Sequence, residues 1–122
     1  MQNGVTAYEA VALQTANLRE LEAKLLLKAG SRLQAVQDSW DRKRGELDDA
    51  LLFNRRLWSL FLDSVTTGKS PLPPGVRQNV ANLGLFVMNH TLTALTDPRP
   101  EQLRSLIAIN REIAAGLMGR AA

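Results

Sequence analysis

Few residues of this chain could take part in acid–base or nucleophilic chemistry. His90 is the only histidine, and the 122 residues include no cysteine. A catalytic histidine needs a nucleophile or an orienting carboxylate placed beside it. None stands near His90 in the sequence, because Asp97 lies beyond the predicted end of the same helix. We therefore interpret His90 as a structural or surface residue.

The adjacent carboxylates Asp48 and Asp49 are a second candidate for acid–base chemistry. Neighbouring residues of a helix point about 100° apart, whereas an acid–base pair converges on one cleft, so these two indicate a solvated face. The chain lacks a spaced set of metal ligands, and no glycine-rich loop follows a strand to hold a phosphate. The sequence predicts a protein that is not an enzyme and that uses no metal and no cofactor.

The basic residues are a third candidate, because the formal net charge is +3. The one cluster, Arg42–Lys43–Arg44, is bracketed by Asp38, Asp41 and Glu46. Carboxylates within a helical turn neutralise such a cluster. A nucleic-acid-binding face has a basic stripe, often with aromatic residues for stacking, and the pattern shows neither. An ordinary solvated helix surface is favoured, and direct binding of nucleic acid is not expected.

The elements that must position these residues are all helices. No segment shows the alternation of a strand, and apolar residues, 45% of the chain, recur at helical spacing. Thr6 and Glu9 form a capping box, and Asn17 is a cap for the next helix. The prolines within residues 69–75 make that segment a stiff connector.

We therefore expect an all-α fold, with four main helices plus a short N-terminal helix, packed as a helical bundle. A single domain covers residues 1–122, with residues 1–16 as an N-terminal arm or short helix. The expected helices cover residues 6–14, 17–40, 47–65, 76–95 and 100–117.

The helix predicted over residues 76–95 has two apolar stripes. The first is Val76, Val80, Leu83, Val87 and Ala94, and the second, nearly opposite, is Ala81, Leu85, Met88, Leu92 and Leu95. A helix that is apolar on two sides needs cover on two sides. It is either the centre of the bundle, which the pattern alone favours, or the floor of a groove that another chain fills.

Asparagines interrupt or flank the apolar stripes, namely Asn54, Asn79, Asn82, Asn89 and Asn110. A buried amide without partners costs about 1–3 kcal/mol. These side chains therefore either bond between helices and set their register or contact a bound chain, and the sequence leaves both alternatives open. Trp40 and Trp58 also occupy stripe positions, where core packing is the default and a partner interface is the alternative.

No segment is suited to a membrane. Apolar runs such as residues 85–88 are far shorter than the roughly 20 residues that span a bilayer. The first basic residue is Arg19, so a secretory signal is not expected. We expect a soluble, cytoplasmic protein.

Three stretches carry a resemblance to a known family: LLFNRRLW at residues 51–58, VRQNVANLG at 76–84 and INREIAAGL at 109–117. Together with neighbouring strings they resemble the FlaF family of alphaproteobacterial flagellar biosynthesis regulators over residues 7–118. The resemblance implies a cytoplasmic protein needed for flagellin production and export. It also implies binding of flagellin in the manner of an export chaperone, alongside FlbT, a regulator of flagellin mRNA translation.

Our leading hypothesis is a flagellin-binding chaperone and regulator that promotes flagellin synthesis and secretion. Apolar surface beyond one core stripe suits a client whose helical termini dock in a groove. The groove is predicted between the two-striped helix and the face of residues 47–65. Its predicted apolar anchors are Phe53, Trp58, Leu60, Leu85, Met88 and Leu92, and its polar contacts are Asn54 and Asn82.

Two alternatives remain at this point. The chain could regulate flagellin mRNA translation directly or through FlbT, and direct RNA binding would weaken when Arg42, Lys43 and Arg44 are neutralised. The second stripe could also be the interface of a homodimer.

Overall fold

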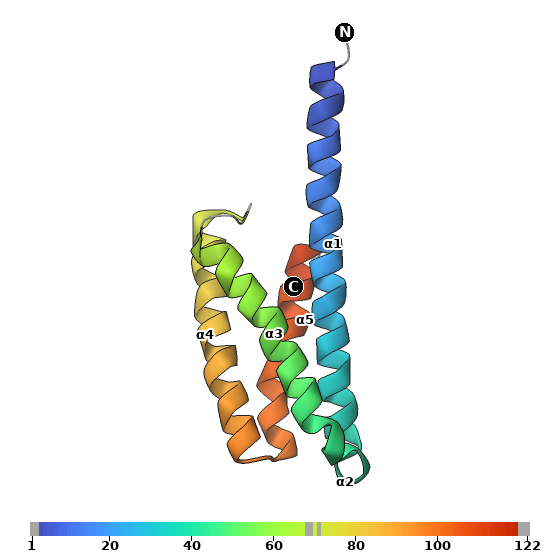
Figure 1. The fold of residues 1–122 in the computed structure, drawn as a ribbon, viewed down its shortest axis with the longest axis vertical. Helices are drawn as coiled ribbons and strands as arrows, with labels where there is room; N and C mark the ends of the chain where they lie inside the picture. The colour runs from blue at the N-terminus through green and yellow to red at the C-terminus, as the bar shows by residue number, and fades with distance from the viewer. Residues whose placement is uncertain (1–2, 68–69, 71, 120–122) are drawn as a thin grey trace.

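The structure is a computed structural model that describes residues 3–67, 70 and 72–119, and within them every regular element is a helix. The main helices pack side by side (Figure 1). The prediction of an all-α bundle with four main helices, α1, α3, α4 and α5, is confirmed. The elements in chain order are α1 (Asn3–Asp38), α2 (Trp40–Lys43), η1 (Arg44–Glu46), α3 (Leu47–Thr66), α4 (Pro74–Thr96), η2 (Pro100–Leu103) and α5 (Arg104–Leu117).

α1 is one continuous helix of 36 residues, so the predicted break between a short leading helix and a main helix is wrong. The expected cap, Asn17, is an exposed residue in the interior of α1. An asparagine in the interior of a helix lowers the stability of the helix by less than about 1 kcal/mol relative to alanine. This loss is too small to interrupt a segment whose other residues favour a helix. Every described side chain before Glu22 is exposed, and this portion of α1 projects beyond the bundle (Figure 1).

α3 occupies the middle of the bundle, because it packs against both α1 and α4 (Figure 1). α5 packs mainly against α1. α4 begins at Pro74, where the missing N–H costs nothing, and it forms one edge of the bundle. α3 and α4 come close at Gly84, where an added Cβ would lie 2.5 Å from Leu62 Cδ2.

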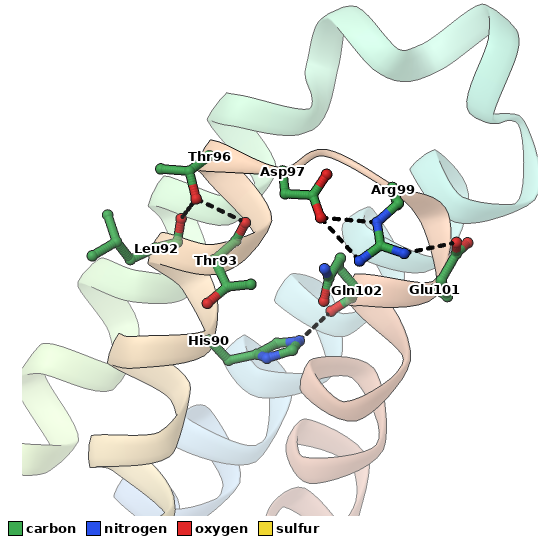
Figure 2. Close-up of polar contacts among 8 residues, drawn as sticks. All are labelled: His90, Leu92, Thr93, Thr96, Asp97, Arg99, Glu101 and Gln102. Atoms are coloured by element: carbon green, nitrogen blue, oxygen red, sulfur yellow. Dashed lines mark hydrogen bonds and ion pairs between the residues drawn. The ribbon is translucent and has the colours of Figure 1, made fainter.

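The turn between α4 and α5 is held by polar contacts (Figure 2). Arg99 Nε donates to Asp97 Oδ2 at 3.0 Å, and Arg99 Nη1 lies 3.8 Å from Glu101 Oε1. His90 Nε2 donates to the Gln102 carbonyl oxygen at 2.7 Å, because a carbonyl can only accept. His90 therefore joins α4 to η2 and has a structural contact of the kind expected from the sequence.

A buried hydrogen-bond network joins three helices in the core. Trp58 Nε1 of α3 donates to Asn110 Oδ1 of α5 at 2.9 Å. Asn110 Nδ2 donates to Asn54 Oδ1 of α3 at 2.7 Å and to the Leu26 carbonyl of α1 at 3.2 Å. Asn54 and Asn110 therefore form hydrogen bonds between helices, which is the first of the two alternatives that the sequence left open for the asparagines.

The two ends of the bundle differ in burial. The closed half, beside the α4–α5 turn, comprises residues 26–38, 47–58, 87–96 and 103–110, and the open half comprises residues 18–25, 59–66, 74–86 and 111–117. In the closed half all four main helices contribute buried apolar residues: Leu33, Val36, Leu47, Leu51, Val87, Ala94, Leu103 and Leu106. In the open half many apolar residues are only half-buried, among them Leu25, Val65, Leu83, Ile113 and Leu117.

Candidate partner-binding surfaces

The two apolar stripes of α4 are adjacent on the helix, and the prediction that they are nearly opposite is wrong. The buried residues are Val80, Gly84, Val87, Thr91 and Ala94. Each residue of the second stripe follows one of these by a single position, hence by about 100° around the helix. We call Ala81, Leu85, Met88, Leu92 and Leu95 the outer stripe.

The outer stripe is exposed because α4 lies at the edge of the bundle. Leu85 and Leu92 are 59% and 60% exposed, while Ala81, Met88 and Leu95 are half-buried. The interpretation of this helix as the centre of the bundle is wrong, because α3 takes the central position and covers only one side of α4. The outer stripe is therefore a candidate surface for another chain.

Two of the predicted contact residues are not on the surface. Trp58 and Asn54 are fully buried and belong to the core network with Asn110. They cannot contact a partner of the folded chain, so their assignment as an anchor and a polar contact is corrected. Asn82 is exposed, and its Oδ1 accepts a hydrogen bond from Gln78 Nε2 at 3.1 Å.

Phe53 and Leu60 lie on a different side of the bundle from the outer stripe. Phe53 is half-buried beside α1, and Leu60, seven residues further along α3, is 65% exposed on the same side. Leu62 lies on the opposite flank of α3, where it faces Gly84 of α4. The predicted single groove is therefore wrong, because α3 separates its two halves.

A basic hollow lies in the closed half, and two of the cations that line it also contact Phe53. Lys28 Nζ lies 5.6 Å and Arg32 Cζ lies 5.0 Å from the centre of the Phe53 ring, in cation–π geometry. Lys28, Arg32 and Lys43 line a depression of about 290 Å³ together with Glu46. Sequence reasoning missed this grouping, because Lys28 and Arg32 of α1 come to line one hollow with Lys43 of α2 only in the folded chain.

The open half contains a groove that sequence reasoning also missed. α4 and α5 meet at their turn and diverge towards the open half, leaving a hollow of about 370 Å³. Its lining comes from α1, the connector, α4 and α5: Arg19, Leu72, Pro73, Val76, Val80, Glu112, Ile113, Gly116 and Leu117. We call this hollow the open-end groove. Leu72, an apolar residue between prolines, was the one sign of this groove in the sequence. The other apolar residues that line the groove fitted ordinary core stripes and gave no indication of it.

A smaller hollow continues the open-end groove inward. It shares Arg19, Leu72, Ile113 and Leu117 with the groove and reaches Phe61 of α3. Glu22 also lines it, and burial raises the pKa of this carboxyl above its ordinary value of 4.5, although the Arg19 guanidinium acts in the opposite direction. The groove thus has an apolar floor with ionisable groups at its edge.

Within residues 3–67, 70 and 72–119, no three histidine or acidic side chains lie close enough to hold a metal ion. Over the same residues, no helix has the length and apolar content needed to cross a bilayer. Three features are candidates for contact with a partner, namely the outer stripe, the basic hollow and the open-end groove.

Comparison with known proteins identifies one family. A family model described as "Flagellar protein FlaF" matches residues 5–117. No curated protein and no solved structure matches the chain. The match covers α3, α4 and α5, all but the first two residues of α1, and all three candidate surfaces, and the earlier resemblance is thereby confirmed.

Proposed function

Because the chain belongs to the FlaF family of flagellar proteins, we propose that it is a chaperone and regulator that binds a helical segment of flagellin. In this proposal the open-end groove receives the segment in the cytoplasm, and binding promotes flagellin synthesis and secretion. The observation that carries the proposal is the apolar groove left where α4 and α5 diverge.

The groove has the character of a helix-binding site. A helix docks through apolar side chains at positions i, i+3 or i+4 and i+7, which enter a groove between helices of the host. The open-end groove presents Val76 and Val80 of α4 opposite Ile113 and Leu117 of α5. Its volume of about 370 Å³ lies in the range of pockets that hold several apolar groups.

The projecting portion of α1 supports the same proposal. Residues 3–21 form about 28 Å of helix, and their described side chains are all exposed. Most of the stability of a helix in a protein comes from tertiary packing, and exposed leucines occur here at Leu13, Leu18 and Leu21. A client helix that leaves the groove past Arg19 would pack along this portion and cover it.

The test is capture of purified flagellin by the full chain. Val76→Asp places a charge at the edge of the groove, in the first turn of α4, where the helix dipole favours an acid. Leu52→Asp is the matched control, because Leu52 is 47% exposed on α3 and Val76 is 45% exposed. We expect Val76→Asp to lose capture and Leu52→Asp to retain it, with both variants folded by circular dichroism.

Two results would reject the groove as the client site. One is unchanged capture by Val76→Asp. The other is loss of capture in Leu85→Asp or Leu60→Asp together with retention in Val76→Asp, because flagellin would then occupy the outer stripe or the α1–α3 side.

The second candidate function, control of flagellin mRNA translation directly or through FlbT, is favoured by the basic hollow. Lys28, Arg32 and Lys43 line this hollow, and the first two lie over the Phe53 ring. Cations beside an aromatic ring suit phosphates and bases. Direct RNA binding predicts an affinity that falls steeply with salt. It also predicts weakening in Lys28→Gln and in the variant with Arg42, Lys43 and Arg44 neutralised, and a filter-binding titration without these effects would contradict it.

A further inference from the structure

We propose that the outer stripe of α4 is a self-association surface, through which two copies of this chain pair with their α4 helices antiparallel. The surface is distinct from the open-end groove, so this inference goes beyond the proposed function. It depends on the spacing, the symmetry and the charges of α4.

The spacing of the outer stripe is that of a helix that pairs with another helix. Successive members are four, three, four and three residues apart, from Ala81 to Leu95. This average of 3.5 residues keeps an apolar seam facing a neighbouring helix along its length. α3 does not provide that neighbour, because Leu85 and Leu92 remain largely exposed beside it.

The stripe is nearly symmetric about Met88. Ala81 and Leu95 lie seven residues to either side of it, and Leu85 and Leu92 lie three and four residues away. A two-fold axis passing close to Met88 would therefore bring the first half of one stripe onto the second half of its copy. Such an isologous contact is the commonest way in which identical chains associate.

The surroundings of the stripe favour a second copy over a charged partner. α4 contains one Lys, Arg, Asp or Glu residue, Arg77, near its N-terminal end. The exposed polar residues around the stripe are amides and hydroxyls: Gln78, Asn82, Asn89, Thr93 and Thr96. Two copies of the chain can approach along this uncharged flank without like-charge repulsion. An ordinary amphipathic helix has charged residues beside its apolar stripe, and these would find no opposite charge on α4.

The ends of α4 are complementary in charge in the antiparallel arrangement. Arg77 lies eleven residues before Met88, and the position eleven residues after Met88 is Arg99, within the turn of Figure 2. This turn also holds Asp97 and Glu101, so the three side chains have one negative charge in excess. In the antiparallel pair, the turn of the second copy would bring these carboxylates towards the Arg77 guanidinium, which otherwise is the one charge on α4.

The first experiment measures the mass of the full chain by sedimentation equilibrium from micromolar to millimolar concentration. Contact between two single helices buries less than the roughly 1,600 Å² of a standard stable interface, so we expect a reversible dimer. Leu92→Glu should weaken it at least about a hundredfold, because an unpaired carboxylate would be buried at the seam. Leu60→Glu is the matched control, since Leu60 is 65% exposed on the other side of α3, and it should leave the dimer unchanged.

The second experiment uses a single introduced thiol, because the chain has no cysteine of its own. Met88→Cys should form an intermolecular disulfide on mild oxidation, because the two-fold axis passes near residue 88. Ala81→Cys should not, because antiparallel pairing places residue 81 near residue 95 of the other copy. Equal cross-linking of both variants would mean a parallel pair and would overturn the arrangement.

Three further outcomes would overturn the proposal. The first is a monomer throughout the concentration range, and the second is equal dimerisation of the Leu92→Glu variant and the unmodified chain. The third is loss of flagellin capture in Leu92→Glu with capture retained in Val76→Asp, because the stripe would then be the client site. Failure of Val76→Asp to affect capture would reject the proposed groove without bearing on the dimer.

Discussion

The closed half and the open half of the bundle are built from the same four helices, yet they differ in how completely their apolar side chains are buried. In the closed half, Leu26, Leu51 and Leu106 are fully buried, and the polar groups of Trp58 and Asn110 bond to each other. In the open half, α4 and α5 diverge and leave an apolar groove. The contrast indicates that the closed half is the more completely packed part of the core, whereas the open half leaves apolar side chains at a groove.

The largest effect is expected from breaking the core network of the closed half. Asn110→Ala would leave the Trp58 N–H and the Asn54 amide without their partners and would open a small cavity. Because each orphaned group costs about 1–3 kcal/mol, we expect a loss of about 4 kcal/mol in the free energy of unfolding, measured by urea denaturation. Asn79→Ala, at an exposed position of α4, should change it by less than about 0.5 kcal/mol. Similar values for the two variants would contradict the role of the network.

The difference between the halves can be measured directly with two truncations on α5. Leu106→Ala removes a fully buried side chain of the closed half, and Ile113→Ala removes a half-buried side chain that lines the groove. We expect losses of about 3 and about 1 kcal/mol respectively, because only the first leaves an enclosed cavity. Equal losses in chemical denaturation would mean that the open half is as well packed as the closed half.

A smaller effect is expected from releasing the α4–α5 turn. His90→Ala removes the hydrogen bond to the Gln102 carbonyl and should cost about 1 kcal/mol, the usual net value of one such bond. Amide hydrogen exchange should increase around η2 and remain unchanged in α1. Uniformly faster exchange in all helices would show that His90 acts on global stability and not on this turn.

The smallest effect concerns the charge beside the groove. Burial raises the pKa of Glu22 in the folded chain above its ordinary pKa of 4.5. The stability that this group contributes is therefore fully present at a pH below 4.5, and it is lost as the pH rises through the pKa of the folded chain. Glu22→Gln stays neutral, so it should raise Tm by about 1–2 °C at about pH 7 and have little effect at about pH 4. Thermal melts with the same shift at both pH values would exclude titration of Glu22 as the cause.

Much of the fold was predictable because helices and their ends depend on nearby residues. The apolar period predicted all four main helices, and the prolines near residue 74 and at Pro98 and Pro100 marked two of the connections. The division of α1 was wrong because the capping signals around Asn17 were overridden by the helical preference of the residues on both sides.

The candidate surfaces were predictable only in part. The exposure of Leu60, Leu85 and Leu92 agrees with a surplus of apolar surface beyond the core. Trp58 and Asn54 were assigned to a groove, although their partner Asn110 lies more than 50 residues away and hides them in the core. The groove beside Ile113 was missed for the same reason, because its walls come from α1, α4, α5 and the connector.

The sequence by itself determined which segments are helical, which positions on each helix are apolar, and to which family the chain is similar. These properties follow from the local period of side chains around a helix, which requires no knowledge of the neighbouring helix. Only the tertiary structure decided which stripes are covered, because burial depends on the order in which distant helices pack. The central position of α3 leaves α4 at the edge, and the divergence of α4 from α5 opens the groove.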